Sequence, residues 1–126
     1  MITLELPMPF YKKNSKALMT MNVYRNLNFR LLNKFKIDYG KQLKEVIKTL
    51  DPIRTNVTLA YELHFVGRKK IDLVNIGCSI DKVFSDCLVE LGVIEDDSIQ
   101  YLNKVTFTGS LGKESMKCFV TIRETK

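Results

Sequence analysis

Apolar residues recur in steps of three and four between residues 22 and 50, and this spacing predicts an amphipathic helix. The apolar stripe consists of Leu32, Phe35, Tyr39, Leu43, Val46 and Leu50. At about 100° per residue, a basic set falls on the opposite side: Arg30, Lys34, Lys41, Lys44 and Lys48. The pattern therefore predicts a helix with one face in the core and a basic back. Pro52 would end this helix, and Gly40 would weaken it by about 1 kcal/mol.

Strict alternation of apolar and polar residues predicts strands. It covers residues 2–6, which two prolines follow, and residues 57–65, which form the clearest half-buried strand. Two more strand-like runs lie at residues 101–108 and 117–123. Because the segment between these two runs contains two glycines, we expect it to form a hairpin.

A second helical pattern lies between the second and third strands, and Gly92 closes it. Its apolar positions are Ile76, Ile80, Val83, Phe84, Cys87, Leu88 and Leu91. The resulting order is β-α-β-α-β-β. It predicts an α+β fold in which residues 1–126 form one two-layer domain, with two helices covering a mostly antiparallel sheet.

Length and composition narrow the possible classes of protein. At 126 residues and 45% hydrophobic, the chain can build one modest core. No apolar run reaches the roughly 18 residues that span a bilayer, and the N-terminus lacks a secretion-signal pattern, so we expect no membrane partner.

Cys78, Cys87 and Cys118 have no C-x-x-C pairing, and we expect reduced thiols in a cytoplasmic protein. The chain has no G-x-x-x-x-G-K-[ST] loop, so no nucleotide cofactor is expected.

Basic and acidic residues are segregated along the chain. Residues 1–70 contain 14 Lys and Arg against 5 Asp and Glu, whereas residues 71–126 contain 6 against 9. With a net charge of +6, this distribution indicates one surface that attracts an anion and another that gathers cations. Nucleic acid is the commonest partner for such a basic region, although a solubilising surface charge explains the composition equally well.

Acidic side chains concentrate in the segment from Asp72 to Asp97, which reads D-L-V-N-I-G-C-S-I-D-K-V-F-S-D-C-L-V-E-L-G-V-I-E-D-D. Its single basic residue is Lys82. Its carboxylates are Asp72, Asp81, Asp86, Glu90, Glu95, Asp96 and Asp97. Such a concentration of carboxylates in a basic protein suggests a divalent cation held against a polyanionic substrate.

The second predicted helix carries a stripe of polar residues at spacings of four, three and four: Asn75, Ser79, Lys82 and Asp86. In a metal-dependent nuclease, carboxylates hold Mg²⁺ or Mn²⁺, which polarises the phosphate and activates the attacking water. A lysine would offset the charge that develops in the transition state. The ordinary alternatives are a surface ion pair between Lys82 and Asp86 and a simple polar turn at residues 96–97.

The segment from Arg68 to Asp97 resembles the signature of RusA-like Holliday junction resolvases, small endonucleases frequent in phages and prophages. The resemblance is specific in this segment and looser elsewhere. It implies a small α+β domain, a homodimer, and a requirement for Mg²⁺, with Mn²⁺ as a substitute. It also implies an enzyme of the bacterial cytoplasm that cuts four-way DNA junctions, a form of branched DNA, by paired nicks.

When the catalytic residues of the family are matched by position to this chain, the resemblance implies catalytic roles for Asp72, Lys82 and Asp97. Lys82 precedes Asp97 by fifteen residues, as in the family. The departure from the family pattern D-x-D-N-x-x-K lies at Val74, which stands where a second aspartate is expected. Asn75 also precedes Lys82 by seven positions instead of three.

A valine cannot bind a hard cation, so another side chain must supply the missing oxygen. The implied metal ligands are Asp72 and Asp97, with Asp86 or Asp96 as the candidate replacement. Asp81 lies about 100° around the helix from Lys82 and is not expected to take part.

Basic residues near both ends of this pattern are candidates for DNA contact. Arg68, Lys69 and Lys70 lie just before the acidic segment and are expected to hold flanking phosphates. The full set of expected DNA-binding residues is Arg68, Lys69, Lys70, Asn75, Lys12 and Lys13. His64, on the polar side of its strand, is interpreted as a structural or phosphate-contacting residue and not as a general base.

Two other functions are consistent with the sequence. Because Val74 replaces a carboxylate, the chain could be a non-catalytic protein that binds branched or single-stranded DNA. Alternatively, it could be a regulatory module whose acidic helix docks on a basic protein partner.

Overall fold

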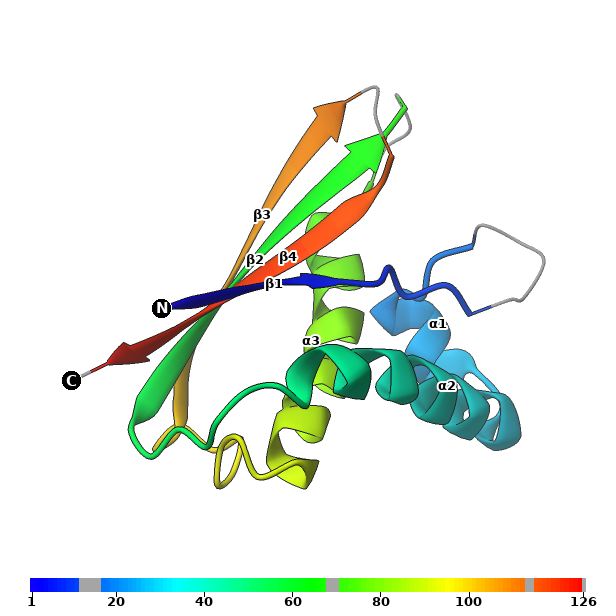
Figure 1. Ribbon diagram of the computed structural model, residues 1–126. Coiled ribbons are helices and arrows are strands. Elements are labelled where there is room, and N and C mark those ends of the chain that lie inside the picture. Colours follow the sequence, from blue (N-terminus) through cyan, green and yellow to red (C-terminus); the bar gives the residue numbers. More distant parts are fainter. Residues whose placement is uncertain (12–16, 68–70, 113–114, 126) are drawn as a thin grey trace.

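The structure, a computed structural model, describes residues 1–11, 17–67, 71–112 and 115–125 (Figure 1). Its elements are β1 (Ile2–Leu6), α1 (Met21–Asn26), α2 (Phe29–Ile47), β2 (Asn56–Val66), α3 (Leu73–Glu90), β3 (Leu102–Gly112) and β4 (Lys117–Thr125). The predicted α+β class and the order of strands and helices are confirmed. The one addition is that the first predicted helix is divided into α1 and α2.

The four strands form one mixed sheet in the order β1-β4-β2-β3. β4 is antiparallel to both β1 and β2, whereas β2 and β3 are parallel. The expected hairpin between the last two strands is therefore wrong, because β2 lies between them. The inward row of β2 is buried along its whole length, while most of β3 is exposed. The most apolar strand thus takes a central position and β3 takes an edge, where water can solvate it.

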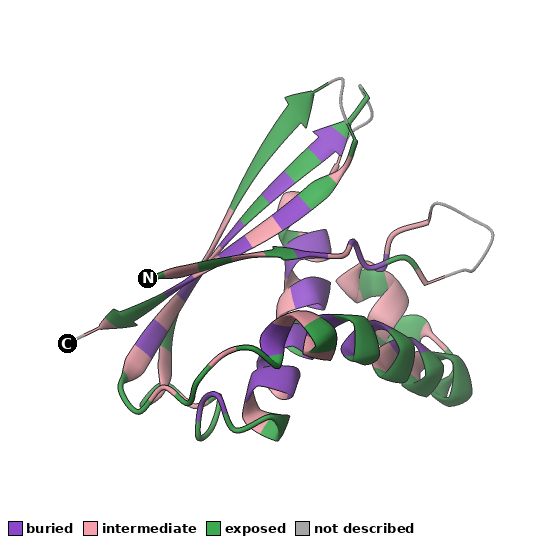
Figure 2. Ribbon diagram, in the orientation of Figure 1, coloured by how far each residue is buried: buried purple, intermediate pink, exposed green. Residues whose placement is uncertain are grey.

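All three helices lie on the same side of the sheet (Figure 1), where α2 and α3 contact its strands and α1 packs on α3. Buried positions accordingly alternate with exposed or half-buried ones along β2 and β4 (Figure 2). The inward side chains of β2 are Val57, Leu59, Tyr61, Leu63 and Phe65, which are at most 3% exposed. No helix among the described residues covers the opposite face, which we call the open face.

The first predicted helix is interrupted at residues 27–28. Leu27 is extended, with φ −73° and ψ 143°, and Asn28 caps the start of α2 by accepting a hydrogen bond from Arg30 N at 2.8 Å. Asparagine side chains compete with helical hydrogen bonding in this way and favour the cap position. Helical periodicity alone does not detect such a break. α2 also ends at Ile47, five residues before Pro52.

α3 begins and ends as its sequence predicts. Asp72 caps its first turn, and its last turn closes with hydrogen bonds from Gly92 N to Val89 O (3.0 Å) and from Val93 N to Leu88 O (2.9 Å). Gly92 has φ 71°, a left-handed conformation that glycine adopts at little cost. The predicted apolar face is buried except at Leu91, which is 42% exposed.

No helix in the described part of the chain is both long and apolar enough to cross a membrane. All three cysteines are free thiols. Burial raises the pKa of Cys87 to about 11 and that of Cys118 to about 12, so both stay protonated near neutral pH.

Candidate functional site on helix α3

At the N-terminal end of α3, polar side chains form hydrogen bonds that hold the helix in place, and they also have atoms that are free to contact a ligand. Asp72 is exposed, and its Oδ1 accepts a hydrogen bond from Asn75 N at 3.1 Å. The Asn75 side chain accepts a hydrogen bond from Asn22 N at 3.2 Å and so joins α3 to α1. One oxygen of each side chain is therefore already engaged, and the other polar atoms remain available to a ligand.

Ser79 lies on the same stripe but is fully buried. Its hydroxyl donates toward Met19 O (2.8 Å) and Ile76 O (2.7 Å). The predicted stripe is therefore not one continuous exposed row, because the segment that precedes α1 covers its middle.

The second half of α3 displays Lys82 and Asp86. Lys82 is exposed, and no ion pair within 4.0 Å joins it to Asp86 or to another described residue. Asp86 lies in a groove of about 330 Å³ between α2 and α3, which Lys36, Lys41 and Lys44 also line. The ordinary i,i+4 ion pair between Lys82 and Asp86 is thus not formed, and the groove that contains Asp86 is lined by lysines.

The turn that follows α3 presents Asp96 and Asp97, both exposed. Asp96 Oδ1 accepts a hydrogen bond from Asp97 N at 2.8 Å. The Asn56 side-chain amide donates to Ile99 O (3.2 Å) and Gln100 O (2.9 Å), which ties the turn to the start of β2. Asp97 therefore lies on a segment that is held to the sheet.

Asp81, which the helical wheel excluded, faces the sheet. Its Oδ1 accepts hydrogen bonds from the hydroxyls of Tyr61 (2.7 Å) and Ser85 (3.0 Å). Burial raises the pKa of the Asp81 carboxyl. These two hydrogen bonds oppose the rise, and the nearby charges of Asp86 and Asp97 add to it. Asp86 and Asp97 therefore lie within electrostatic reach of Asp81, and we name the three residues together the α3 acidic cluster.

Sequence reasoning did not identify Asp81, although one signal was present. Tyr61 alternates inward among aliphatic residues on β2 and is fully buried. A buried tyrosine hydroxyl usually requires a hydrogen-bond partner. The sequence could therefore have predicted a polar residue on the facing helix, but not which one.

Because the pKa of Asp81 is raised in the folded protein, we predict that stability depends on pH. The folded protein holds this proton to a higher pH than the unfolded chain does, so stability falls as the pH rises from the usual aspartate range through the folded-state pKa. Relative to Asp81→Asn, the native protein should therefore lose free energy of unfolding as the pH rises above about 4, the usual pKa of an aspartate. Urea unfolding across this range measures the difference. Asp38→Asn, an exposed position on α2, serves as the control and should show no comparable trend.

The donor chemistry of the α3 acidic cluster suits a hard cation, since carboxylate oxygens are the ligands that Mg²⁺ prefers. Among the described residues, however, no three His, Cys, Asp or Glu side chains are arranged to hold a metal ion by themselves. Mg²⁺ commonly binds through one or two carboxylates together with phosphate oxygens of the substrate. The arrangement therefore fits a metal that binds with its substrate better than one held in a complete protein cage.

The expected phosphate contacts at Arg68, Lys69, Lys70, Lys12 and Lys13 lie outside the described residues. The basic back predicted for the first helix is present on α2. Arg30, Lys34 and Lys41 are exposed, Lys44 forms an ion pair with Glu90, and Lys48, the C-cap residue, forms an ion pair with Glu45. Glu90 therefore belongs to a contact between helices and not to the α3 acidic cluster.

Comparisons with protein-family models and with curated proteins found no match to this chain.

Proposed function

We propose that this protein is a metal-dependent, structure-selective endodeoxyribonuclease that resolves four-way DNA junctions, as the RusA-like resemblance implies. The observation that supports it most is the α3 acidic cluster. In it, the negative charges of Asp86 and Asp97 contribute to the raised pKa of Asp81, and the exposed Lys82 follows Asp81 in the chain. A structural ion-pair network would neutralise these carboxylates, but no salt bridge to them occurs within the described residues. Carboxylates that perturb the pKa of a neighbouring carboxyl without forming a salt bridge favour a functional role.

In the proposed mechanism, Asp97 and Asp86 are the metal ligands, and Asp72 is a further carboxylate at the start of α3. Asp86 is a better replacement for the carboxylate missing at Val74 than Asp96, because it lies on α3 four residues after Lys82 and its charge contributes to the raised pKa of Asp81. When bound, Mg²⁺ or Mn²⁺ would polarise the scissile phosphate and activate the attacking water. Lys82 would place its ammonium group against the negative charge that develops on the phosphate.

The proposal includes a homodimer in the bacterial cytoplasm, encoded by a bacterium or by a phage. A four-way junction presents two equivalent strands, and a dimer with two-fold symmetry would present two equivalent sites to them. Recognition would rely on phosphates and on junction shape, without base readout.

The direct test is a cleavage assay on a four-way junction, a flap and a linear duplex, each with Mn²⁺, with Mg²⁺ and with EDTA. We expect nicks at paired positions in the four-way junction, and we expect no nicks in EDTA. Cleavage that persists in EDTA would contradict the proposed site. Equal cleavage of all three substrates would contradict the proposed selectivity.

A second candidate function is a non-catalytic protein that binds branched or single-stranded DNA. It is favoured by Val74, which is 56% exposed at a position where the family pattern has an aspartate. Salt-sensitive junction binding without nicking at any concentration of Mg²⁺ or Mn²⁺ would support it. Absence of salt-sensitive DNA binding would instead favour a protein-binding role.

A further inference from the structure

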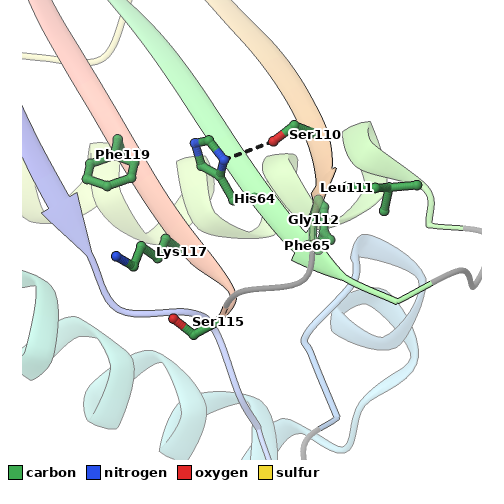
Figure 3. Close-up of a pocket in the computed structure, with 8 residues that line it drawn as sticks. All are labelled: His64, Phe65, Ser110, Leu111, Gly112, Ser115, Lys117 and Phe119. Atoms are coloured by element: carbon green, nitrogen blue, oxygen red, sulfur yellow. Dashed lines mark hydrogen bonds between the residues drawn. The ribbon is translucent and has the colours of Figure 1, made fainter.

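A pocket of about 400 Å³ lies at the end of the sheet where β2 and β3 finish (Figure 3). His64, Ser110 and Lys117 come from three different strands, and the register of the sheet places them in one row. His64 of β2 is paired with Ser110 of β3 on one side and with Lys117 of β4 on the other. Their side chains belong to the open face, because the neighbouring Leu63 and Phe65 point inward.

The polar side chains that line this pocket are His64, Ser110, Ser115 and Lys117. His64 Nδ1 and Ser110 Oγ lie 2.8 Å apart. Lys117 is exposed, so its ammonium group is available to a ligand. The Lys117 ammonium and the Ser115 hydroxyl suit an acceptor-rich anion such as a phosphate group, whereas the Ser110 hydroxyl is already engaged with His64.

Among the described residues, two carboxylates oppose an anion on this face, because the register pairs both Glu62 and Glu5 with Phe119. Glu62 Oε2 lies 4.0 Å from His64 Nε2, on a different edge of the imidazole from Ser110. This distance is too long for a hydrogen bond, so the three residues do not form a hydrolytic triad. The anion-binding side of the pocket is therefore the side formed by Ser115 and Lys117, across His64 from Ser110 (Figure 3).

An aromatic surface adjoins these donors. The ring of Phe119 is half-buried and packs edge-to-face with His64, with ring centroids 5.8 Å apart and an interplanar angle of 89°. Because this contact fixes the ring, little side-chain entropy would be lost when a flat ligand packs on it. A nucleobase is such a ligand, and base stacking on aromatic side chains is the common mode of single-strand binding.

We infer that this pocket binds one nucleotide of a single DNA strand, with its phosphate at Lys117 and Ser115 and its base on Phe119. The volume lies in the range of small-ligand pockets, about 300–1,000 Å³, and suits a nucleotide unit but not a duplex. The assignment of DNA as the ligand rests on the proposed function, whereas the pocket itself is separate from the α3 acidic cluster. The two lie on opposite faces of the sheet. A strand leaving a junction could therefore be held away from the site of cleavage.

The test is an NMR titration of the ¹⁵N-labelled full chain with octathymidylate in EDTA, so that no cleavage can occur. We expect shifts in the amides of His64, Ser110, Lys117 and Phe119. Phe119→Leu should weaken binding about 5-fold or more, the range found when a base loses its aromatic partner. Lys117→Gln should lower the slope of log K against log salt by about 0.7.

Lys104→Gln is the matched control, because Lys104 is an exposed lysine of β3 that does not line the pocket. Its salt slope should fall less than that of Lys117→Gln. If Phe119→Leu were to unfold the protein, Lys117→Gln would still decide the question, since it changes an exposed side chain. Unchanged affinity and salt slope in Lys117→Gln, or amide shifts confined to α3, would overturn the inference. Nicking in Mn²⁺ is a separate readout, so failure of the pocket can be distinguished from failure of the proposed nuclease.

Discussion

Asp97→Asn is expected to abolish metal-dependent nicking of a four-way junction while leaving junction binding largely intact. Asparagine keeps the shape of the side chain but loses the charge that holds a cation. The contribution of a bound metal is several kcal/mol, and each 1.36 kcal/mol is a factor of ten in rate, so the loss should be about 10³-fold or more. Single-turnover cleavage and electrophoretic binding assays would separate the two effects.

Glu90→Gln is the matched control for this experiment. It removes an exposed carboxylate from the last turn of α3, but one that pairs with Lys44 of α2 and lies outside the α3 acidic cluster. Exposed ion pairs contribute little to stability, so this variant should fold and cleave like the native protein. Equal loss of activity in both variants would indicate a general effect of charge on DNA binding and not a specific role for Asp97.

Gly77→Ala is expected to lower the free energy of unfolding by about 1–3 kcal/mol, the usual cost of overpacking. A Cβ at this position would lie 2.4 Å from Phe107 Cδ1. The Phe107 ring cannot move away easily, because it stacks on the fully buried Tyr61 with ring centroids 5.3 Å apart. The clash should exceed the gain of about 1 kcal/mol that alanine brings to a helix. Urea unfolding followed by circular dichroism measures the net change.

Gly40→Ala tests the same substitution in α2, where there is room for it. A Cβ at Gly40 would lie 3.7 Å from Cys87 Sγ, an ordinary van der Waals distance. This variant should therefore be unchanged or more stable by up to about 1 kcal/mol. Destabilisation of both variants by the same amount would mean that helix packing around each glycine, and not the contact with Phe107, determines the cost.

Local patterns predicted the elements of the fold well. The alternation on β2 and the three-and-four spacing on α3 correspond to buried rows in the structure, and Gly92 ends α3 as expected. The division between α1 and α2 was missed because it depends on one residue, Asn28, whose side chain accepts a backbone hydrogen bond at the cap. A periodicity read over nearly thirty residues averages out such a local signal.

The α3 acidic cluster could be predicted only in part. Asp86 and Asp97 were singled out from spacing and from the RusA-like resemblance, whereas Asp81 was excluded by its angle from Lys82. The angle between Asp81 and Lys82 around the helix was correct. Whether Asp81 takes part in the site depends, however, on which residues face that side of α3. There the hydroxyl of Tyr61, twenty residues earlier in the chain, donates a hydrogen bond to Asp81. A helical wheel contains no information about this partner.

The sequence by itself therefore determined the α+β class, the order of the elements, their inward faces and the position of the acidic segment on α3. These features depend on interactions between residues that are close in the chain, and local periodicity records them. The tertiary structure alone decided that β2 separates β3 from β4, that Ser79 is buried, and that Asp81 joins Tyr61. It also brought His64, Ser110 and Lys117 into one row. Each of these depends on which distant segments pack together, and that choice is set by the total apolar surface buried and not by the spacing within any one segment.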